Sequence, residues 1–587
     1  MRAGRNHVRI GGAAGFWGDS ALGPRQLLDG GDLDYLVFDY LAELTMSLLA
    51  AARRKHPELG YATDFIDVMR DVLADALARG VRIVANAGGI NPQGCAAALR
   101  ALAAEQGLAP RIAVVEGDDV SALLPGLRAE GLPLPATVLS ANAYLGALPV
   151  KAALDSGADV VITGRCVDSA VTLGALMHEF GWAAGDYDLL AAGSLAGHLI
   201  ECGCQGSGGL FTDWEDVPDW ANSGYPVVEC RADGSFVLGK PESSGGLVSP
   251  AAAAEQLLYE IGDPAHYLLP DVVCDFTGVT LEPAGPQRVL VQGARGRAPT
   301  PTYKVSATYA DGFRSAAQLT IVGHDAGRKA RRSAEAILTR TRAMFARAGL
   351  ADYSATHIDI LGAQEGFGQA VMWLAVAHPQ RAALESFTRE IAPAGTSWAP
   401  GTTGFGGRPS VSPAIKQFSF LLDKNRIQPV VHLPDGEQAR PAIPPGTAAT
   451  AEPVSHLGVA PRGEGVTRAL PREGWRMVPL IELAWARSGD KGDTSNIGVI
   501  ARHPGDLPLL REQLTPEAVA AHLADKVSGP VTRYELPGIH AFNFVCEQAL
   551  GGGGMASLRH DPLGKGMAQW LLAMPVAVPP DFTSRRT

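Results

Sequence analysis

The stretch VRIVANAGGINPQGCAAALRALAAE, residues 81–105, contains the pattern that sets the fold class of this chain. It opens with a short apolar run, passes through a turn of small and amide residues, and continues as a helical pattern from Pro92. Proline is favoured at the first position of a helix, and a short, uniformly apolar run is typical of a strand buried on both faces. The stretch therefore predicts a buried strand at 81–86 and a helix at 92–105.

The same alternation of apolar runs and helical patterns repeats along the first 200 residues. The predicted strands are 8–11, 35–39, 81–86, 112–116, 137–140 and 160–164, and the predicted helices are 41–52, 63–78, 92–105 and 172–180. Apolar strands separated by helices are typical of a parallel sheet that is covered on both faces. We therefore predict an α/β fold with an open, Rossmann-like parallel sheet, and an irregular barrel is the alternative.

The rest of the chain has a different pattern of apolar and polar residues. From about residue 270, a long helical pattern and several segments in which apolar and polar residues alternate, as in antiparallel strands, predict an α+β insert. A stretch rich in proline, glycine and charge then predicts a linker, and the last segment predicts a ferredoxin-like α+β domain. The predicted domains are 1–268 (α/β, carrying the site), 269–427 (α+β module), 428–475 (linker) and 476–580 (ferredoxin-like).

Length, charge and cysteine content exclude several classes of protein. A chain of 587 residues is too long for one core, so we expect two to four domains. The net charge is −11 without a basic cluster, which argues against nucleic-acid binding. The chain has neither a signal peptide nor an apolar run long enough to span a membrane. Seven cysteines, an odd number, indicate free thiols in a reducing compartment. We therefore expect a cytoplasmic protein.

Polar side chains follow four of the predicted strands, at the points where these strands end. Carboxyl ends of parallel strands meet at one edge of a sheet, which is where ligands bind in α/β proteins. Taken singly, each residue is more typical of a loop or a helix cap than of a catalytic site. Together they predict a site built from Asp39, Glu43, Asn86, Asn142, Arg165 and Asp168.

The run GHLIECGCQGSGG, residues 197–209, contains an imidazole, a carboxylate, two thiols and an amide within a short stretch. His198 and Glu201 are three residues apart, so they share a face if the run is helical. Such a pair can act as an acid–base couple or bind a metal. The alternative is a helix end, where His198 lies near the last carbonyls and Gly203 stops the helix. We predict His198 and Glu201 as catalytic residues, with Asp39 and Glu43 as their partners.

Several further residues are candidates for substrate binding. Gly12 follows the first strand, where backbone N–H groups can approach an anion, and a plain turn is the alternative. Arg165 can bind a carboxylate or phosphate or pair with Asp168. Lys491 can bind phosphates or belong to a simple hairpin turn. The predicted substrate-binding residues are Asn86, Asn142, Arg165, Asp168, Gln205, Ser207, Gly12 and Lys491, of which Asn86, Asn142 and Gln205 polarise a carbonyl. We assign no residue as a metal ligand.

These motifs resemble the acyclic terpene utilisation protein A family over nearly the whole chain. The matching residues are 39–46 (DYLAELTM), 86–89 (NAGG), 159–165 (DVVITGR), 197–209, 488–493 (SGDKGD) and 551–554 (GGGG). The resemblance implies a large N-terminal region and a ferredoxin-like C-terminal domain joined by a linker. It also implies a catabolic role beside acyl-CoA carboxylases, hydratases and dehydrogenases, without naming a reaction.

We therefore predict an enzyme that acts on a branched or acyclic-terpene-derived acyl-CoA or carboxylate by proton-transfer chemistry, as a lyase, a hydratase or a thioester hydrolase. The acyl-CoA part follows from the resemblance. One alternative is a non-catalytic binding or assembly subunit of an acyl-CoA degradation pathway. Another is a hydrolase or lyase that depends on a divalent metal. We assign no resident cofactor, and we expect a coenzyme A thioester as a possible substrate, a small-molecule ligand and a homo-oligomer.

Overall fold

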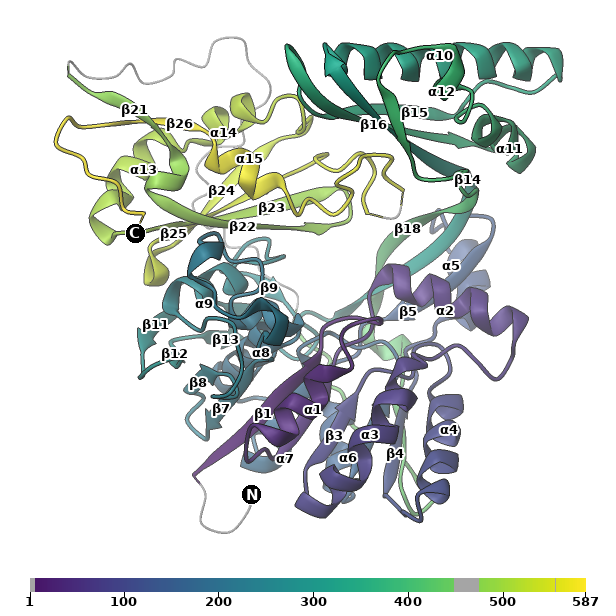
Figure 1. The fold of residues 1–587 in the computed structure, drawn as a ribbon. Coiled ribbons are helices and arrows are strands. Elements are labelled where there is room, and N and C mark those ends of the chain that lie inside the picture. Colours follow the sequence, from purple (N-terminus) through teal and green to yellow (C-terminus); the bar gives the residue numbers. More distant parts are fainter. Residues whose placement is uncertain (1–5, 448–473, 555, 587) are drawn as a thin grey trace.

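The computed structural model describes residues 6–447, 474–554 and 556–586 (Figure 1). In this part of the chain, strands and helices form a large mixed sheet, a second sheet under two helices, and a C-terminal sheet. The chain is therefore a mixed α/β protein. Among the described residues, we find no helix with both the length and the apolar character needed to cross a membrane.

Within the described residues, the large sheet has eleven strands in the order β11-β12-β8-β7-β1-β2-β3-β6-β4-β19-β20. Its five central strands are parallel: β1 (His7–Ala14), β2 (Tyr35–Phe38), β3 (Arg82–Ala85), β6 (Val160–Thr163) and β4 (Ile112–Glu116). The outer strands are antiparallel: β7 (Val227–Arg231), β8 (Phe236–Gly239), β12 (Val289–Gln292), β11 (Thr280–Pro283), β19 (Val430–His432) and β20 (Gln438–Ala439). The parallel pairing that the sequence predicts is thus limited to the centre of a mixed sheet.

Helices cover both faces of the parallel strands, which explains why these strands are uniformly apolar. Successive side chains of a strand point to opposite faces. Val37 therefore packs into one core and Phe38 into the other, and both are buried. One face is covered by α1 (Leu22–Asp29), α3 (Asp64–Arg79) and α4 (Pro92–Glu105), and the other by α6 (Leu148–Asp155), α7 (Ala170–Phe180) and α8 (Tyr187–Ile200).

The strand predicted at 137–140 does not join the parallel sheet. As β5 (Val138–Ala143), it pairs antiparallel with the long strand β14 (Thr302–His324) of the second sheet. Its polar and apolar residues alternate, which suits an antiparallel strand with two different faces. The Ser140 hydroxyl lies 2.7 Å from that of Thr308 on the neighbouring strand, so polar contacts fix this pairing.

The strand β14 links the two halves of the second sheet. Its first half pairs with β5 and β18 (Ser412–Asp423), and its second half pairs with β16 (Phe367–His378) and β17 (Thr402–Phe405). The edge strand β15 (Ala355–Gly362) pairs with β16. Two helices, α10 (Ala326–Arg347) and α11 (Arg381–Arg389), pack against the second half (Figure 1).

The C-terminal sheet is antiparallel, in the order β22-β23-β25-β24. Its strands are β22 (Ala484–Lys491), β23 (Thr494–Ala501), β25 (Ala541–Cys546) and β24 (Val531–Leu536). The accompanying helices are α13 (Leu507–Gln513), α14 (Pro516–His522) and α15 (Met567–Leu572), and β21 (Arg476–Pro479) pairs with β26 (Pro575–Val578). The domain lies against the turn that follows α9 (Pro250–Leu257) (Figure 1).

Glycines allow this close approach of the C-terminal sheet. A Cβ on Gly498 would lie 2.5 Å from the Cβ of Leu258, and one on Gly489 would lie 2.5 Å from Cγ of Glu260. Any side chain at either position would push the sheet away from the N-terminal part. The segment predicted as a linker, 428–475, contributes β19 and β20 to the large sheet, and its residues 448–473 lie outside the described residues. The division into domains stays a prediction.

Candidate functional site

Three of the predicted strand-end residues meet at the carboxyl ends of neighbouring strands. Asp39, Asn86 and Arg165 follow β2, β3 and β6, and all three are buried. The Asn86 amide donates a hydrogen bond to the carboxyl of Asp39 and accepts one of 2.7 Å from the Tyr40 N–H. Asn86 thus positions Asp39. The predicted contact of Asn86 with a substrate carbonyl stays a prediction.

Arg165 is held between a carboxylate and an aromatic ring. Its Nη1 lies 2.7 Å from Oδ1 of Asp168, and its guanidinium carbon lies 4.1 Å from the centre of the Tyr144 ring. The Tyr144 hydroxyl in turn donates a hydrogen bond to Glu43. The ion pair with Asp168, which the sequence leaves open as an alternative, is therefore present. Arg165 supplies a fixed positive charge at the centre of the cluster.

Glu43, at the start of α2 (Glu43–Lys55), is surrounded by cations and donors. Nζ of Lys304 on β14 lies 3.7 Å from its carboxylate, and the Gln417 amide on β18 donates to it at 3.3 Å. Burial favours the neutral form, but the charges of Lys304 and its neighbours outweigh it and hold the pKa of Glu43 at about 2. Lys304 is absent from the sequence-based candidates, although a lysine within a run of strand-forming residues was an available signal.

His198 and Glu201 form a pair at the end of α8. The His198 Nδ1 lies 3.0 Å from Oε1 of Glu201, and its Nε2 lies 3.2 Å from the carbonyl oxygen of Leu257. A carbonyl can only accept, so Nε2 carries a proton and Nδ1 faces the carboxyl. Burial opposes the charge on His198, yet Glu201 raises its pKa above the usual value. Burial likewise raises the pKa of Glu201, although His198 opposes that shift. Each group thus holds a proton more readily than it does in water.

The carboxyl groups of the cluster have pKa values that are shifted in opposite directions. Burial, followed by the charge of Asp168, raises the pKa of Asp39 well above its usual value, and Glu201 adds to this shift. The pKa of Glu43 is low because cations surround it. Asp39, Glu43 and Asp168 all act on the charge of Arg165, and Glu201 acts on Asp39, so these carboxyl groups lie around one arginine. The four residues predicted as catalytic, including His198, are therefore brought together.

The C-terminal domain adds Lys491 to this cluster. Its Nζ lies 3.0 Å from Oε2 of Glu260, and Nζ of Lys565 lies 3.2 Å from the other oxygen of that carboxylate. Partial loss of surrounding water opposes the charge of Lys491, but Glu260 and other acidic neighbours raise its pKa well above the usual value. The half-exposed side chain of Lys491 therefore stays cationic, as the prediction of an anion-binding role requires.

Lys491 and Lys304 face the same cavity of about 460 Å³, where the second sheet meets loops of the C-terminal domain. The cavity is lined by Lys304, Gln417, Ser419, Lys491, Gly492, Asp493, Gly552, Gly553, Gly554 and Ala556. Gly552 and Gly553 have φ values of 99° and 86°, a conformation that side chains rarely adopt. The glycine loop thus leaves the space above the two lysines open.

Four of the predicted substrate-binding residues are engaged by the protein itself. The Gly12 N–H donates to the Pro226 carbonyl at 3.0 Å, and its missing side chain makes room for the end of α8. The Gln205 carbonyl accepts from Arg487 at 2.8 Å, and the Ser207 hydroxyl donates to the Cys204 carbonyl at 3.1 Å. The remaining residue, Asn142, donates to Asp118 at 2.8 Å. Their polar groups make contacts within the protein, because each of these residues lies where two segments of the chain meet.

The structure also bears on thiol and metal chemistry. Burial raises the pKa of Cys202 well above its usual value, and nearby carboxylates raise it further, so this thiol stays protonated. Among the described residues, no three or more histidine, cysteine, aspartate or glutamate side chains are arranged to hold a metal ion.

Comparison with known families fits both parts of the chain. The model of the acyclic terpene utilisation family protein AtuA matches residues 8–433. The chain belongs to the AtuA family. The AtuA ferredoxin-like domain matches residues 478–577, which confirms the ferredoxin-like prediction for the C-terminal segment. No curated protein and no solved structure matches the chain. Membership of the AtuA family connects the protein to acyclic terpene utilisation.

Proposed function

We propose that this AtuA-family protein is an enzyme that transfers protons on a carboxylate or coenzyme A thioester derived from an acyclic terpene. The family supports the terpene setting. One observation carries the chemistry: neighbouring carboxyl groups have pKa values shifted apart, with Glu43 low and Asp39 and Glu201 high. Such a separation is how enzymes set up an acid and a base at one pH.

In this proposal, His198 and Glu201 act as the acid–base couple. A proton held by the pair is transferred to or from the substrate, and the bond from Nε2 to the Leu257 carbonyl fixes the imidazole ring. Asp39 stays protonated through burial and serves as a second proton donor. Arg165 balances the negative charge that develops nearby. This arrangement suits hydration, carbon–carbon cleavage and thioester hydrolysis alike, because each needs a proton moved beside a polarised carbonyl.

Lys304 and Lys491 are proposed to bind the anionic part of the substrate. Both face the cavity of about 460 Å³, and the glycine loop leaves room for a carboxylate or phosphate beside them. Lys491 comes from the ferredoxin-like domain, so that domain completes the site. In this proposal the catalytic groups come from the large α/β part, and the anion is bound between the two parts.

A panel of branched acids and their coenzyme A thioesters tests the proposed reaction class. The full-length protein is incubated with each compound in deuterated water, and the products are analysed by mass spectrometry. We expect at least one compound to gain deuterium at carbon, to gain or lose water, or to be cleaved. An unchanged panel would exclude the enzyme and favour a binding or assembly subunit. Activity that requires added zinc, manganese or iron would instead favour the metal-dependent alternative.

Replacing Lys491 with methionine tests anion binding by the C-terminal domain. A charge-assisted hydrogen bond contributes about 1.5–3 kcal/mol, so KM is expected to rise roughly 10- to 100-fold, with a smaller change in kcat. Lys526→Met is the matched control, because this lysine lies in the same domain and also pairs with a carboxylate, that of Asp525, but does not line the cavity. Equal KM values for the two variants would remove Lys491 from the site.

A further inference from the structure

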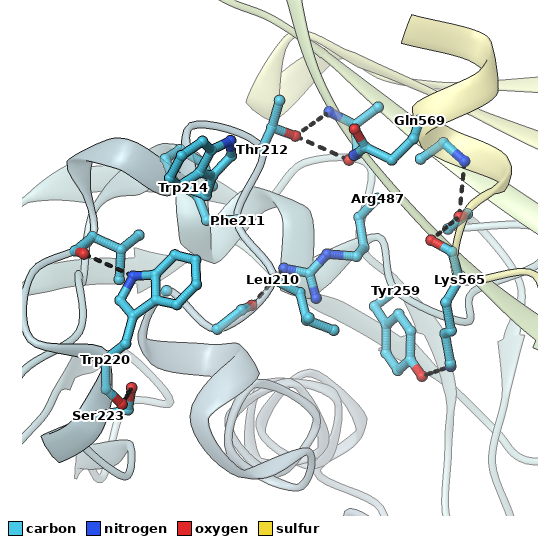
Figure 2. A pocket seen from close by; sticks show the side chains of 16 residues that line it. Leu210, Phe211, Thr212, Trp214, Trp220, Ser223, Tyr259, Arg487, Lys565 and Gln569 are labelled. Atoms are coloured by element: carbon cyan, nitrogen blue, oxygen red, sulfur yellow. Dashed lines mark hydrogen bonds between the residues drawn. The ribbon is translucent and has the colours of Figure 1, made fainter. Parts of the chain in front are cut away.

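A second cavity, of about 480 Å³, lies between the loop at 208–223 and the C-terminal domain (Figure 2). Its volume is within the range of small-molecule sites. The residues that matter most for its character are Leu210, Phe211, Trp214, Val217, Trp220 and Tyr259. Apolar and aromatic side chains therefore dominate the walls.

Large apolar side chains around this cavity remain exposed to solvent. The exposed fractions are 67% for Leu210, 55% for Trp214 and 61% for Trp220, and the two indole rings meet edge to face with their centres 5.9 Å apart. Leu210 also has a φ of 62°, which is unfavourable for a side chain of its size. Exposed apolar groups gathered at one concave site mark a place where an apolar ligand binds.

The charged groups in the cavity are already neutralised by the protein. The Arg487 guanidinium donates to Glu255, to Gln205 at 2.8 Å and to the Gly209 carbonyl at 2.9 Å. Lys565 contacts the Tyr259 hydroxyl and the Glu260 carboxylate. A ligand in this cavity thus meets apolar surface and paired charges, which suits a neutral hydrocarbon group better than an anion.

The cavity is adjacent to the acid–base cluster. Lys565, at its edge, shares the Glu260 carboxylate with Lys491, which faces the anion-binding cavity. Tyr259 forms part of the wall and precedes Glu260 in the chain, so the wall lies beside the carboxylate that both lysines contact. Glu260 thus connects the two cavities through the lysine that lines each of them.

We propose that the cavity framed by Trp214 and Trp220 binds the branched hydrocarbon chain of the acyclic terpene derivative. This inference rests on the proposed function, to which it adds the part of the site that selects the apolar chain. An isoprenoid chain offers several methyl groups and double bonds, and these pack well against indole rings. The anionic end of the ligand binds at Lys304 and Lys491.

Calorimetric titration of the full-length protein with geraniol, an acyclic monoterpene alcohol without a charge, tests this cavity. We expect the wild type to bind geraniol, and Trp214→Ala to weaken binding about tenfold, which corresponds to about 1.4 kcal/mol. Trp570→Ala is the matched control, because Trp570 is 50% exposed on the same helix as the cavity residue Gln569 but does not line the cavity. The control should bind as the wild type does.

A second variant guards against a loss of folding in Trp214→Ala. Gln569 is an exposed cavity residue, so Gln569→Trp fills the cavity without disturbing the core and should also weaken geraniol binding. Absent wild-type binding, or equal affinity in wild type and Gln569→Trp, would overturn the inference. Geraniol binding that depends on these residues, together with an unchanged acid and thioester panel, would keep the cavity and reject the enzymatic proposal.

Discussion

Glu201→Gln is expected to lower kcat by roughly 10²- to 10⁴-fold while KM changes little. The glutamine side chain has nearly the same shape, and its amide N–H can donate a hydrogen bond to Nδ1 of His198, which lies 3.0 Å from the carboxyl oxygen in the wild type. It cannot bind or release a proton as the carboxyl does. The variant therefore removes the acid–base function and leaves the surrounding packing in place.

The chain offers a matched control on its surface. His56 and Glu58 also form a pair, with Nδ1 and Oε1 3.6 Å apart, but both side chains are mostly exposed. Glu58→Gln should leave kcat and KM unchanged. Steady-state kinetics on a converted thioester or acid, with circular dichroism to confirm folding, makes the comparison. A folded Glu201→Gln variant with wild-type kcat would show that the pair only holds the end of α8.

Local patterns were enough to predict the parallel centre of the large sheet and the residues at its edge. Uniformly apolar strands occur where helices cover both faces, and β4 has the predicted bounds 112–116. Because carboxyl ends of parallel strands share one edge, Asp39 and Arg165 could be placed together without knowing any contact. The His198–Glu201 pair followed from helical spacing alone.

Contacts between distant segments account for what sequence patterns missed. Strand β5 pairs with β14 because of contacts such as Ser140 with Thr308, which no local pattern reveals. Gln205 looked free to bind a substrate, but its partner Arg487 lies 282 residues further along the chain. Lys304 belongs to the site because β14 lies beside α2 in the folded chain, which local sequence patterns do not show. Side-chain chemistry was predictable, whereas the partner of each side chain depended on tertiary structure.

Arg487→Met is expected to destabilise the protein by about 3–5 kcal/mol, the range seen when one partner of a buried ion pair is removed. Nη2 of Arg487 lies 3.2 Å from Oε2 of Glu255, and both side chains are almost inaccessible. Arg487 belongs to the C-terminal sheet and Glu255 to α9, so the pair holds the two parts of the chain together. Methionine fills similar space but leaves the carboxylate without its cation. Denaturant unfolding measures the effect.

Two further variants separate lost charge pairing from lost packing. Glu255→Gln combined with Arg487→Met should recover part of the stability, because a neutral amide can still accept the 3.1 Å hydrogen bond from the Thr212 N–H. Arg585→Met removes a partly exposed ion pair with Asp506 and should cost less than about 1 kcal/mol. A double variant no more stable than Arg487→Met would assign the effect to packing.

The pH dependence of these variants gives an independent test of the same pair. Burial raises the pKa of Glu255 to about 7, although Arg487 lowers it, so the folded state binds a proton more readily than the unfolded chain. The contribution of Glu255 to stability is therefore largest below its usual pKa and is lost as the pH rises towards 7. Without Arg487, the ionised carboxylate is disfavoured further, whereas the protonated form needs no cation. The destabilisation by Arg487→Met should thus be greater at pH 8 than at pH 5, and an equal loss at both values would contradict a buried charge as its cause.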